Sequence, residues 1–201
     1  MKFSATNLSR RSLLMAGAVF GGAGMVGLFS RLATANEGDT IVVKPGKVSI
    51  ERFDDAGKSL GVESVDKVIK SEDEWKQVLA DAPQAAVAFY VTRQEGTERA
   101  FTGPYWDNHE KTGLYRCRCC DNALYDAATK YDSGTGWPSF YQPIAKTNVL
   151  EQPDEDGFRT KVSCTLCEAH LGHVFNDGPA PTGLRYCMDG VALRYVPRPA
   201  T

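Results

Sequence analysis

Four of the six cysteines form two pairs with identical spacing. Cys117 and Cys120 make one C-x-x-C motif, Cys164 and Cys167 make a second, and residues 121–163 separate them. Each motif offers two sulfur ligands from one tight turn, so a fold that brings the turns together predicts a tetrahedral four-thiolate zinc site. Four sulfurs leave no position for water, so the one zinc ion per chain would be structural. Two disulfides are the alternative, since an oxidising compartment favours them.

The other two cysteines have different surroundings. Cys119 lies within the first motif and does not reproduce the two-residue gap of the second, so we interpret it as a non-ligand. Cys187 has no partner by count, which makes it a candidate reactive thiol. A thiol reacts as its thiolate, which nearby positive charge stabilises. If this segment is a strand, Arg185 points to the same face as Cys187 and supplies that charge.

Two histidines follow the second motif, three residues apart. They are His170 and His173. Because four thiolates complete a zinc site, neither imidazole is needed as a ligand, and we expect proton transfer if either has a chemical role. A purely structural role is the alternative. His109 lies in the polar stretch 107–111, and we interpret it as a solvated loop residue.

Local patterns predict the elements that must position these residues. Alternating apolar and polar residues in the segment 39–60, with a turn at 54–57, predict a strand or short hairpin. A capping box at Ser71–Glu74 predicts one helix start, and a second short helix is expected over about 83–95. Beyond it, short Tyr, Phe, Val and Leu runs broken by Gly, Pro, Asp and Asn predict a mainly antiparallel β domain.

The first 35 residues have the three parts of an export signal. Arg10 and Arg11 precede an uncharged apolar run over 13–29, and small residues at 33–35 follow. The paired arginines resemble a twin-arginine signal, which implies that the twin-arginine export machinery transports the folded protein. We therefore expect a periplasmic protein of a Gram-negative bacterium. The alternative is a protein held at the membrane by an uncleaved signal.

The composition excludes several classes of protein. Of 201 residues, 42% are hydrophobic, 10% aromatic and 24% charged, which is typical of a globular chain and excludes general disorder and a polytopic membrane protein. The formal net charge is -2, but the segment 1–35 contains basic residues and no acidic ones. The rest of the chain is therefore acidic, which argues against nucleic-acid binding.

Several ordered segments, spread over roughly residues 70–196, resemble the methionine-R-sulfoxide reductase B family. Besides the two C-x-x-C motifs, these segments are Gly96-Thr97-Glu98, Phe101-Thr102-Gly103, Tyr105-Trp106-Asp107-Asn108, Gly136-Trp137-Pro138-Ser139-Phe140, His170-Leu171-Gly172-His173-Val174-Phe175 and Arg185-Tyr186-Cys187.

This resemblance implies a mainly β fold of two antiparallel sheets with a few short flanking helices. It also implies a structural zinc, as in many members, and so favours the four-cysteine zinc site over disulfides. We accordingly divide the chain into an export signal (1–35), an N-terminal extension with a strand or hairpin (36–69) and a reductase-like domain (70–201).

The resemblance further implies an activity: reduction of the R epimer of methionine sulfoxide, in oxidised proteins or free, to methionine. By this match Cys187 is the nucleophile, which attacks the sulfoxide sulfur and is left as a sulfenic acid. His173 matches the acid that protonates the departing oxygen. His170 and Arg185 would support the geometry and charge of the site.

The substrate-binding residues that the resemblance implies are aromatic. Trp137 matches the indole that packs on the substrate's methyl group, because a broad aromatic face can hold a methyl-sulfur group while donors hold the oxygen. Core packing is the alternative for Trp137, although its glycine-flanked loop favours an exposed pocket wall. Trp106 and Phe175 are the other expected substrate-binding residues.

Two positions depart from the family pattern. Asp189 stands two residues after the nucleophile, where the family commonly has asparagine. An ionised carboxylate there would raise the pKa of Cys187, whereas a protonated one could donate a hydrogen bond as an amide does. Thr135 occupies the position at which many members have a resolving cysteine. We therefore expect an external thiol, either a thioredoxin-like protein or a small molecule, to reduce the sulfenic acid.

Three other functions would use these residues differently. An exported zinc-ribbon-like binding module without catalysis gives no role to Cys187. A thiol-disulfide oxidoreductase would instead need exchangeable disulfides in the C-x-x-C motifs. A weakly active sulfoxide binder would follow if Asp189 disables the nucleophile. Assays with the separate sulfoxide epimers, metal analysis and thiol counting distinguish these functions.

Overall fold

The computed structural model describes residues 39–198, which all lie in one compact unit of the chain. The predicted export signal at 1–35 lies outside the described residues. Among the helices within 39–198, none is long and apolar enough to cross a membrane. The two α-helices there are α1 (Glu72–Val78) and α2 (Ala85–Gln94). The strands are β1 (Lys47–Phe53), β2 (Ser59–Asp66), β3 (Gly113–Cys117), β4 (Ala123–Asp126), β5 (Lys130–Tyr131), β6 (Ser139–Phe140), β7 (Val149–Pro153), β8 (Thr160–Cys164), β9 (His170–Phe175), β10 (Arg185–Met188) and β11 (Leu193–Pro197).

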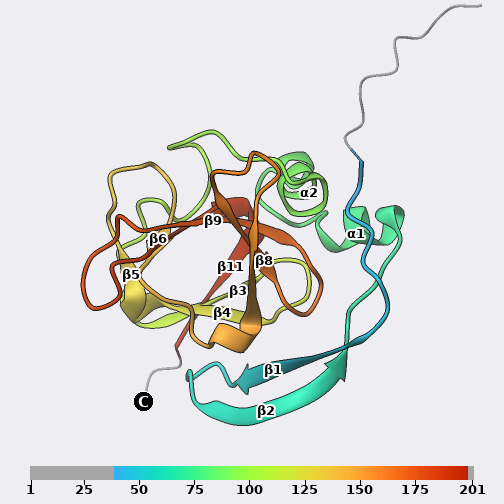
Figure 1. Cartoon of the computed structure of the whole chain (residues 1–201), viewed down its shortest axis with the longest axis horizontal. Coiled ribbons are helices and arrows are strands. Elements are labelled where there is room, and N and C mark those ends of the chain that lie inside the picture. Colours follow the sequence, from blue (N-terminus) through green and yellow to red (C-terminus); the bar gives the residue numbers. More distant parts are fainter. Residues whose placement is uncertain (1–38, 199–201) are drawn as a thin grey trace, which may run out of the picture. The chain divides into compact units, whose positions relative to one another are not determined.

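Two antiparallel sheets build the domain that follows the helices (Figure 1). The larger sheet has the strand order β5-β6-β10-β9-β8-β7, and the smaller has the order β11-β3-β4. Every strand pair in both sheets is antiparallel. The predicted mainly β class, with short flanking helices, is confirmed.

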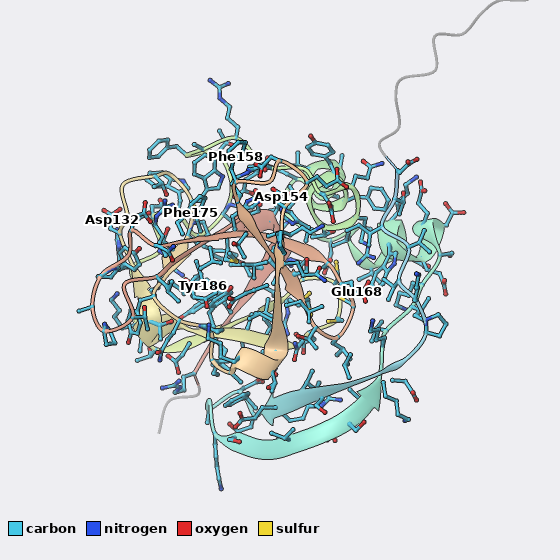
Figure 2. The ribbon with its side chains drawn as sticks, viewed as in Figure 1. Asp132, Asp154, Phe158, Glu168, Phe175 and Tyr186 are labelled. Atoms are coloured by element: carbon cyan, nitrogen blue, oxygen red, sulfur yellow. The ribbon has the colours of Figure 1, made fainter. Side chains whose placement is uncertain are left out.

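Aromatic side chains from both sheets form the core between them, and one of these, Tyr186, is labelled in Figure 2. Tyr115 of β3 and Tyr125 of β4 contact Phe140 of β6, with ring centroids 5.0 and 4.3 Å apart. Tyr186 of β10 lies 5.9 Å from Tyr125, and all four side chains are fully buried. Side chains alternate between the two faces of a strand, so the inward Tyr186 turns the neighbouring Cys187 to the opposite face of β10.

Both predicted helices are present. At the start of α1 the Ser71 hydroxyl accepts a hydrogen bond from the Glu74 amide, and the Glu74 carboxylate accepts one from the Ser71 amide at 2.7 Å. The buried Trp75 of α1 lies under the Arg93 guanidinium of α2, 4.6 Å from the ring centroid. Arg93 also donates to the carbonyl oxygen of Cys167 at 3.0 Å. The helices are thereby joined to the second C-x-x-C turn.

The N-terminal extension contains an antiparallel hairpin of β1 and β2, in the segment for which a strand or hairpin is predicted. Ile50 of β1 is completely buried. The buried side chain of Asn148 accepts a hydrogen bond from the Glu51 amide and donates to the Glu51 and Ala123 carbonyls, each at 2.8 Å. One amide side chain therefore holds β1 onto the β domain.

Strands β9 and β10 place two candidate catalytic residues side by side. In their register Cys187 lies opposite His173, and Met188 lies opposite Gly172. Gly172 has φ of +142°, and a side chain there would overlap the carbonyl oxygen of Cys187. Glycine at this position therefore permits the close strand approach that positions Cys187.

Candidate active site

Cys187 lies in β10 with a partly exposed side chain. Its Sγ lies 3.8 Å from the hydroxyl of Thr135. This hydroxyl begins a chain, from Thr135 to Ser133 at 2.8 Å and from Ser133 to Ser139 at 2.7 Å. The sulfur therefore has hydrogen-bond donors beside it.

Opposing effects act on the Cys187 thiol. Burial raises its pKa, the Thr135 hydroxyl, Arg185 and the Ser139 hydroxyl lower it, and Asp189 raises it. The net result is a pKa above the ordinary thiol value. The thiol is therefore largely protonated in the free protein at neutral pH, and the same donors can stabilise the thiolate when it forms.

Arg185 shares the less buried face of β10 with Cys187, as expected for a strand. Its guanidinium makes two hydrogen bonds to the Asp177 carboxylate, at 2.8 and 2.7 Å, and lies 4.3 Å from the ring centroid of Phe175. Such a bidentate pair holds the guanidinium in one orientation. Arg185 therefore presents a fixed positive charge to the neighbourhood of the sulfur.

A cavity of about 110 Å³ opens over Cys187. It is lined by Thr97, Trp137, Arg159, His173, Phe175, Cys187 and Asp189. The Trp137 indole N–H donates to the carbonyl oxygen of Glu98 at 3.1 Å, which fixes the ring. The lining does not include Trp106, whose ring meets Phe101 edge-on with centroids 5.3 Å apart. A substrate-binding role for Trp106 stays a prediction.

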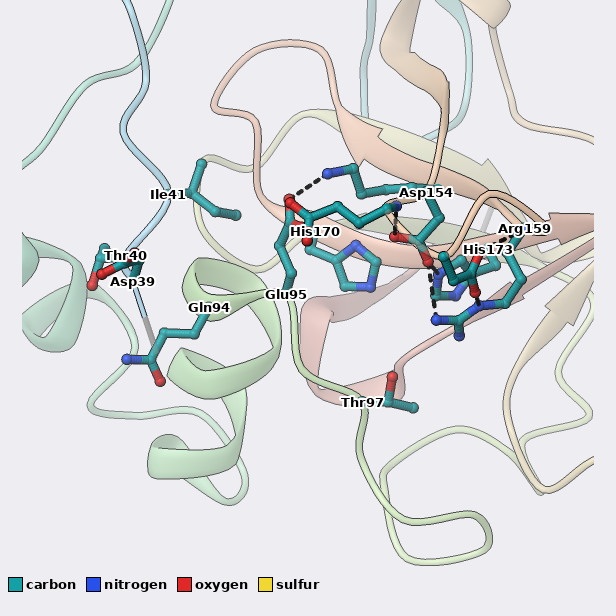
Figure 3. Close-up of a pocket in the computed structure, with 13 residues that line it drawn as sticks. Asp39, Thr40, Ile41, Gln94, Glu95, Thr97, Asp154, Arg159, His170 and His173 are labelled. Carbon is teal, nitrogen blue, oxygen red and sulfur yellow. Dashed lines mark hydrogen bonds and ion pairs between the residues drawn. The ribbon is translucent and has the colours of Figure 1, made fainter. Parts of the chain in front are cut away.

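His173 forms a short polar chain with two residues of the β7–β8 connection (Figure 3). Its Nε2–H donates to Oδ2 of Asp154 at 2.8 Å, and Arg159 pairs with the same oxygen at 3.0 Å. Burial lowers the pKa of His173, and the Asp154 hydrogen bond opposes that effect. Burial alone would raise the pKa of Asp154, but the bonds from His173 and the Glu155 amide, with the Arg159 charge, lower it overall. The carboxylate is thus ionised and orients the imidazole.

His170 is almost completely buried, and its ring lies edge-on to that of His173 with centroids 5.3 Å apart. Neither ring nitrogen of His170 has a hydrogen-bond partner among the described residues. Burial, together with the charge of nearby His173, lowers the pKa of His170 to about 3. The imidazole is therefore neutral near pH 7.

Asp189 is buried at the cavity wall beside a second acid, Glu98. Asp189 Oδ1 accepts a hydrogen bond from the Glu98 amide at 2.8 Å, and the Glu98 carboxylate accepts from the amides of Gly190 and Val191 at 2.6 and 3.0 Å. Burial raises the pKa of Asp189 to about 8, and the Glu98 charge adds to the shift. Asp189 is therefore mainly protonated at neutral pH and has an O–H to donate, as an amide would.

The four cysteines of the C-x-x-C motifs come together at the ends of β3 and β8, with all four sulfurs within 4.8 Å of one another. Sγ of Cys117 lies 3.7 Å from that of Cys167, and Sγ of Cys120 lies 3.5 Å from that of Cys164. A tetrahedral zinc with bonds of about 2.3 Å needs sulfurs about 3.8 Å apart, whereas a disulfide needs about 2.05 Å. The donor set and spacing therefore fit a structural zinc ion.

Cys119 belongs to the surroundings of this metal site. It is buried, and its thiol interacts with Cys117, Cys167 and the Thr92 side chain of α2. It is not among the residues that line the cavity over Cys187.

Several residues at this site have no role in the sequence-based prediction. Among them are Thr97 and Glu98, which precede the aromatic segments, and Asp154 and Arg159, which flank the turn between β7 and β8. Thr97 and Glu98 lie in the segment Gly96-Thr97-Glu98, which contributes to the family resemblance, but the sequence predicts no role for either residue. No local spacing links Asp154 to His173, because the pairing of β8 with β9 creates their contact.

Comparisons with known proteins agree with this arrangement. Residues 85–197 match the SelR domain. Over 136 residues, 67% of this chain and 99% of the relative, the chain is 52% identical to peptide methionine sulfoxide reductase MsrB of Pseudomonas syringae pv. syringae. It is 49% identical to MsrB of Hahella chejuensis over 133 residues, which are 65% of this chain and 91% of the relative.

A plant relative is similar to the same extent. The chloroplastic peptide methionine sulfoxide reductase B1 of Arabidopsis thaliana is 54% identical over 127 residues, 62% of this chain. The matched part spans 59% of that relative's length. The domain match and these identities show that the chain belongs to the SelR-domain family of methionine-R-sulfoxide reductases, the MsrB oxidoreductases.

Proposed function

We propose that this protein reduces the R epimer of methionine sulfoxide in oxidised proteins of the cell envelope, with an external thiol as reductant. The observation that supports it best is the 110 Å³ cavity, which joins the Cys187 sulfur, the His173 imidazole and the Trp137 indole in one place. A nucleophile, an acid and an apolar wall are the groups that sulfoxide reduction requires.

The cavity suits the end of a methionine sulfoxide side chain. At about 30 Å³ for each water-sized group, 110 Å³ holds on the order of four such groups. The methyl, sulfur and adjoining methylene lie against Trp137 and Phe175, while the oxygen faces the polar wall that contains His173 and Asp189. The peptide backbone is left outside the cavity.

Reaction begins with attack of the Cys187 sulfur on the sulfoxide sulfur. The thiolate gains stabilisation from Arg185 and from the Thr135 hydroxyl as it forms. Protonated His173, held by Asp154, gives a proton to the sulfoxide oxygen, which takes a second proton from solvent and leaves as water while the bond between the Cys187 sulfur and the substrate sulfur forms. A water molecule then attacks the Cys187 sulfur, breaks that sulfur–sulfur bond and loses a proton, which releases methionine and leaves a sulfenic acid on Cys187. The sulfoxide is thus reduced by two electrons and Cys187 is oxidised by two.

Two thiols of an external reductant restore Cys187. The first forms a mixed disulfide with the sulfenic acid and releases water, and the second displaces Cys187 as the thiol and leaves the reductant as a disulfide. Thr135, a hydroxyl residue, occupies the place beside Sγ, and Cys119 is buried at the metal site. These two facts favour a thioredoxin-like protein or a small thiol over internal resolution.

The zinc ion would have a structural role and no part in the reaction. Cys117, Cys120, Cys164 and Cys167 would hold it, and its four thiolate ligands would fix the two turns. The catalytic groups are separate side chains on β9, β10 and the neighbouring loops.

We place the reaction in the periplasm because residues 1–35 resemble a twin-arginine signal, which would direct the protein to the twin-arginine export machinery. No other part of the chain supports this location. An uncleaved signal would instead hold the protein at the membrane. Fractionation of cells that express the full chain, with Arg10→Lys and Arg11→Lys as the control, tests this part: failure to reach the periplasm in the wild type contradicts it.

The activity itself is tested with separate R and S epimers of methionine sulfoxide in a blocked peptide, with dithiothreitol as reductant. We expect turnover of the R epimer only and complete loss in Cys187→Ser. Equal turnover of the S epimer, or full activity without Cys187, contradicts the proposal. Cys119→Ser should turn over as fast as the wild type with a dithiol protein reductant, and a first turnover without recycling in this variant would make Cys119 the resolving thiol.

A further inference from the structure

A second, larger cavity, shown in Figure 3, shares lining residues with the one over Cys187 and so adjoins it. Its volume is about 690 Å³, and three residues, Thr97, Arg159 and His173, line both cavities. Its other walls come from the segment 39–41, the end of α2 at Gln94 and Glu95, the turn 154–156, Lys161 and His170. The mechanism above uses only the His173 side of this space.

The larger cavity has an excess of negative charge. Five acids, Asp39, Glu95, Asp154, Glu155 and Asp156, and two bases, Arg159 and Lys161, line it. Both bases are already paired within the wall: Lys161 with Glu95 at 2.5 Å, and Arg159 with Asp154 and Asp156 at 3.0 and 2.5 Å. Over the described residues, no ion pair involves Asp39 or Glu155. Two carboxylates thus remain to meet an incoming cation.

His170 adds a buried group without a partner to the same cavity. Its side chain is about 1% exposed, lines the cavity, and has two ring nitrogens without hydrogen bonds among the described residues. Figure 3 shows the ring between Glu95 and the Asp154–His173 pair. A neutral imidazole has one nitrogen with a free lone pair, which can accept a hydrogen bond from an ammonium or guanidinium group.

We propose that this cavity is a subsite for a lysine or arginine side chain that neighbours the methionine sulfoxide in the substrate polypeptide. This inference rests on the proposed function. The cavity over Cys187 admits only the end of the oxidised side chain, so adjacent substrate residues must lie on the surrounding surface. The three shared lining residues put the acidic cavity next to that surface.

The segment that completes the subsite lies outside the matched SelR domain, which starts at residue 85. It is fixed to the helices: the Ile41 amide donates to the carbonyl of Arg93 at 2.7 Å, and the Thr40 hydroxyl donates to Glu72 at 3.0 Å. The N-terminal extension therefore adds one wall, with the Asp39 carboxylate, to the surface beside the catalytic cavity.

The test compares blocked pentapeptides that contain methionine-R-sulfoxide with Lys, Ala or Glu on either side, using dithiothreitol and the wild-type protein. We expect kcat/KM to be about 2- to 5-fold higher with Lys than with Ala, and lower again with Glu, as for a partly exposed ion pair. The preference should shrink when the salt concentration rises from 0.05 to 0.5 M, because salt screens it.

The variant Asp39→Asn/Glu155→Gln removes the two carboxylates without an ion pair and should bring the Lys-to-Ala ratio close to one. Asp81→Asn/Glu110→Gln removes the same charge from exposed positions elsewhere and should keep the wild-type ratio. Equal rates for Lys, Ala and Glu peptides in the wild type overturn the subsite, as does a ratio that falls equally in both double variants. Absence of turnover of every peptide would instead contradict the proposed function.

Discussion

The reactivity of Cys187 depends on which neighbouring side chains are charged. Arg185, on the same face of β10 as Cys187, is positively charged and is held by Asp177. Asp189, on the wall of the cavity over Cys187, is mainly neutral at pH 7 because burial raises its pKa to about 8. A neutral acid at this place adds a donor without adding repulsion. The aspartate that stands where the family commonly has asparagine is therefore compatible with a nucleophilic thiol.

Asp189 should limit activity at alkaline pH. As the pH rises through about 8, Asp189 ionises, and its charge raises the pKa of Cys187. We expect the kcat/KM of the wild type to fall in this range relative to Asp189→Asn, with similar values for both at pH 6.5. Rates measured from pH 6 to 9.5 check this, and parallel profiles of the two proteins would contradict it.

The same group should affect stability. Its folded pKa of about 8 lies above the unfolded value of about 3.9, so its contribution is complete below about pH 4 and is lost as the pH rises through 8. The Asp189→Asn variant does not lose stability in this way, because asparagine does not ionise. The Tm of the variant minus that of the wild type should therefore grow between pH 5 and 8 and then level off, in thermal denaturation followed by circular dichroism. A constant difference would mean that Asp189 is ionised throughout.

Asp154 orients His173, the proposed proton donor, rather than reacting itself. In Asp154→Asn the imidazole of His173 loses a partner that raises its pKa. We expect kcat to fall about 10- to 100-fold, and the decline of activity on the alkaline side to move to lower pH. The control is Asp81→Asn, an exposed acid without an ion pair among the described residues. Loss of kcat with an unchanged pH profile would assign Asp154 a structural role only.

At the scale of elements, the close approach of β9 and β10 sets the catalytic geometry. Their register puts His173 opposite Cys187, and the core contacts of Tyr186 turn the thiol outward. The β7–β8 connection supplies Asp154 and Arg159, and the loop that contains Trp137 supplies the apolar wall. The groups come from β9, β10, the β7–β8 connection and the loop before β6, so the site forms only when these parts of the larger sheet come together.

Gly172→Ala should disrupt that geometry. An added methyl group would overlap the Cys187 carbonyl oxygen, and φ of +142° is unfavourable for alanine. We expect a loss of about 1–3 kcal/mol in the free energy of unfolding in urea and a larger loss of activity, since β10 must shift. Gly46→Ala, whose added methyl meets no neighbouring atom, is the control. Full activity in Gly172→Ala would show that the strands tolerate separation.

At the scale of the whole described domain, the four-cysteine site joins the two sheets. Cys117 ends β3 of the smaller sheet, and Cys164 ends β8 of the larger one. The second turn also holds α2 through the Arg93 bond to Cys167. A zinc ion held by these cysteines would therefore stabilise contacts between elements that are far apart in sequence.

Zinc removal should destabilise the domain. We expect one zinc per chain, and a fall in Tm on the order of 10 °C after exhaustive chelation, with loss of activity. Cys164→Ser should lose the metal, whereas Cys119→Ser should retain it. Elemental analysis and thermal denaturation measure both effects, and a metal-free protein of unchanged Tm would rule out the structural role.

The sequence by itself determined the features that depend on neighbours along the chain. Two ligands in one C-x-x-C turn, the Ser71 capping box and the alternation that puts Arg185 and Cys187 on one face need only local geometry. Cys187 was identified by count, and its role came from the resemblance of whole segments. These signals sufficed for the fold class and the four-cysteine metal site, whereas the role of Cys187 as nucleophile stays a prediction.

Only the tertiary structure decided which distant groups face one another. Asp154 meets His173 because β8 pairs with β9, and the Glu98 amide meets Asp189 across 91 positions of sequence. The protonation of Asp189, the unpartnered nitrogens of His170 and the wall formed by 39–41 follow from the same packing. Burial and charge pairing between remote segments leave no periodic pattern in the chain, because they arise only when the sheets close around the core.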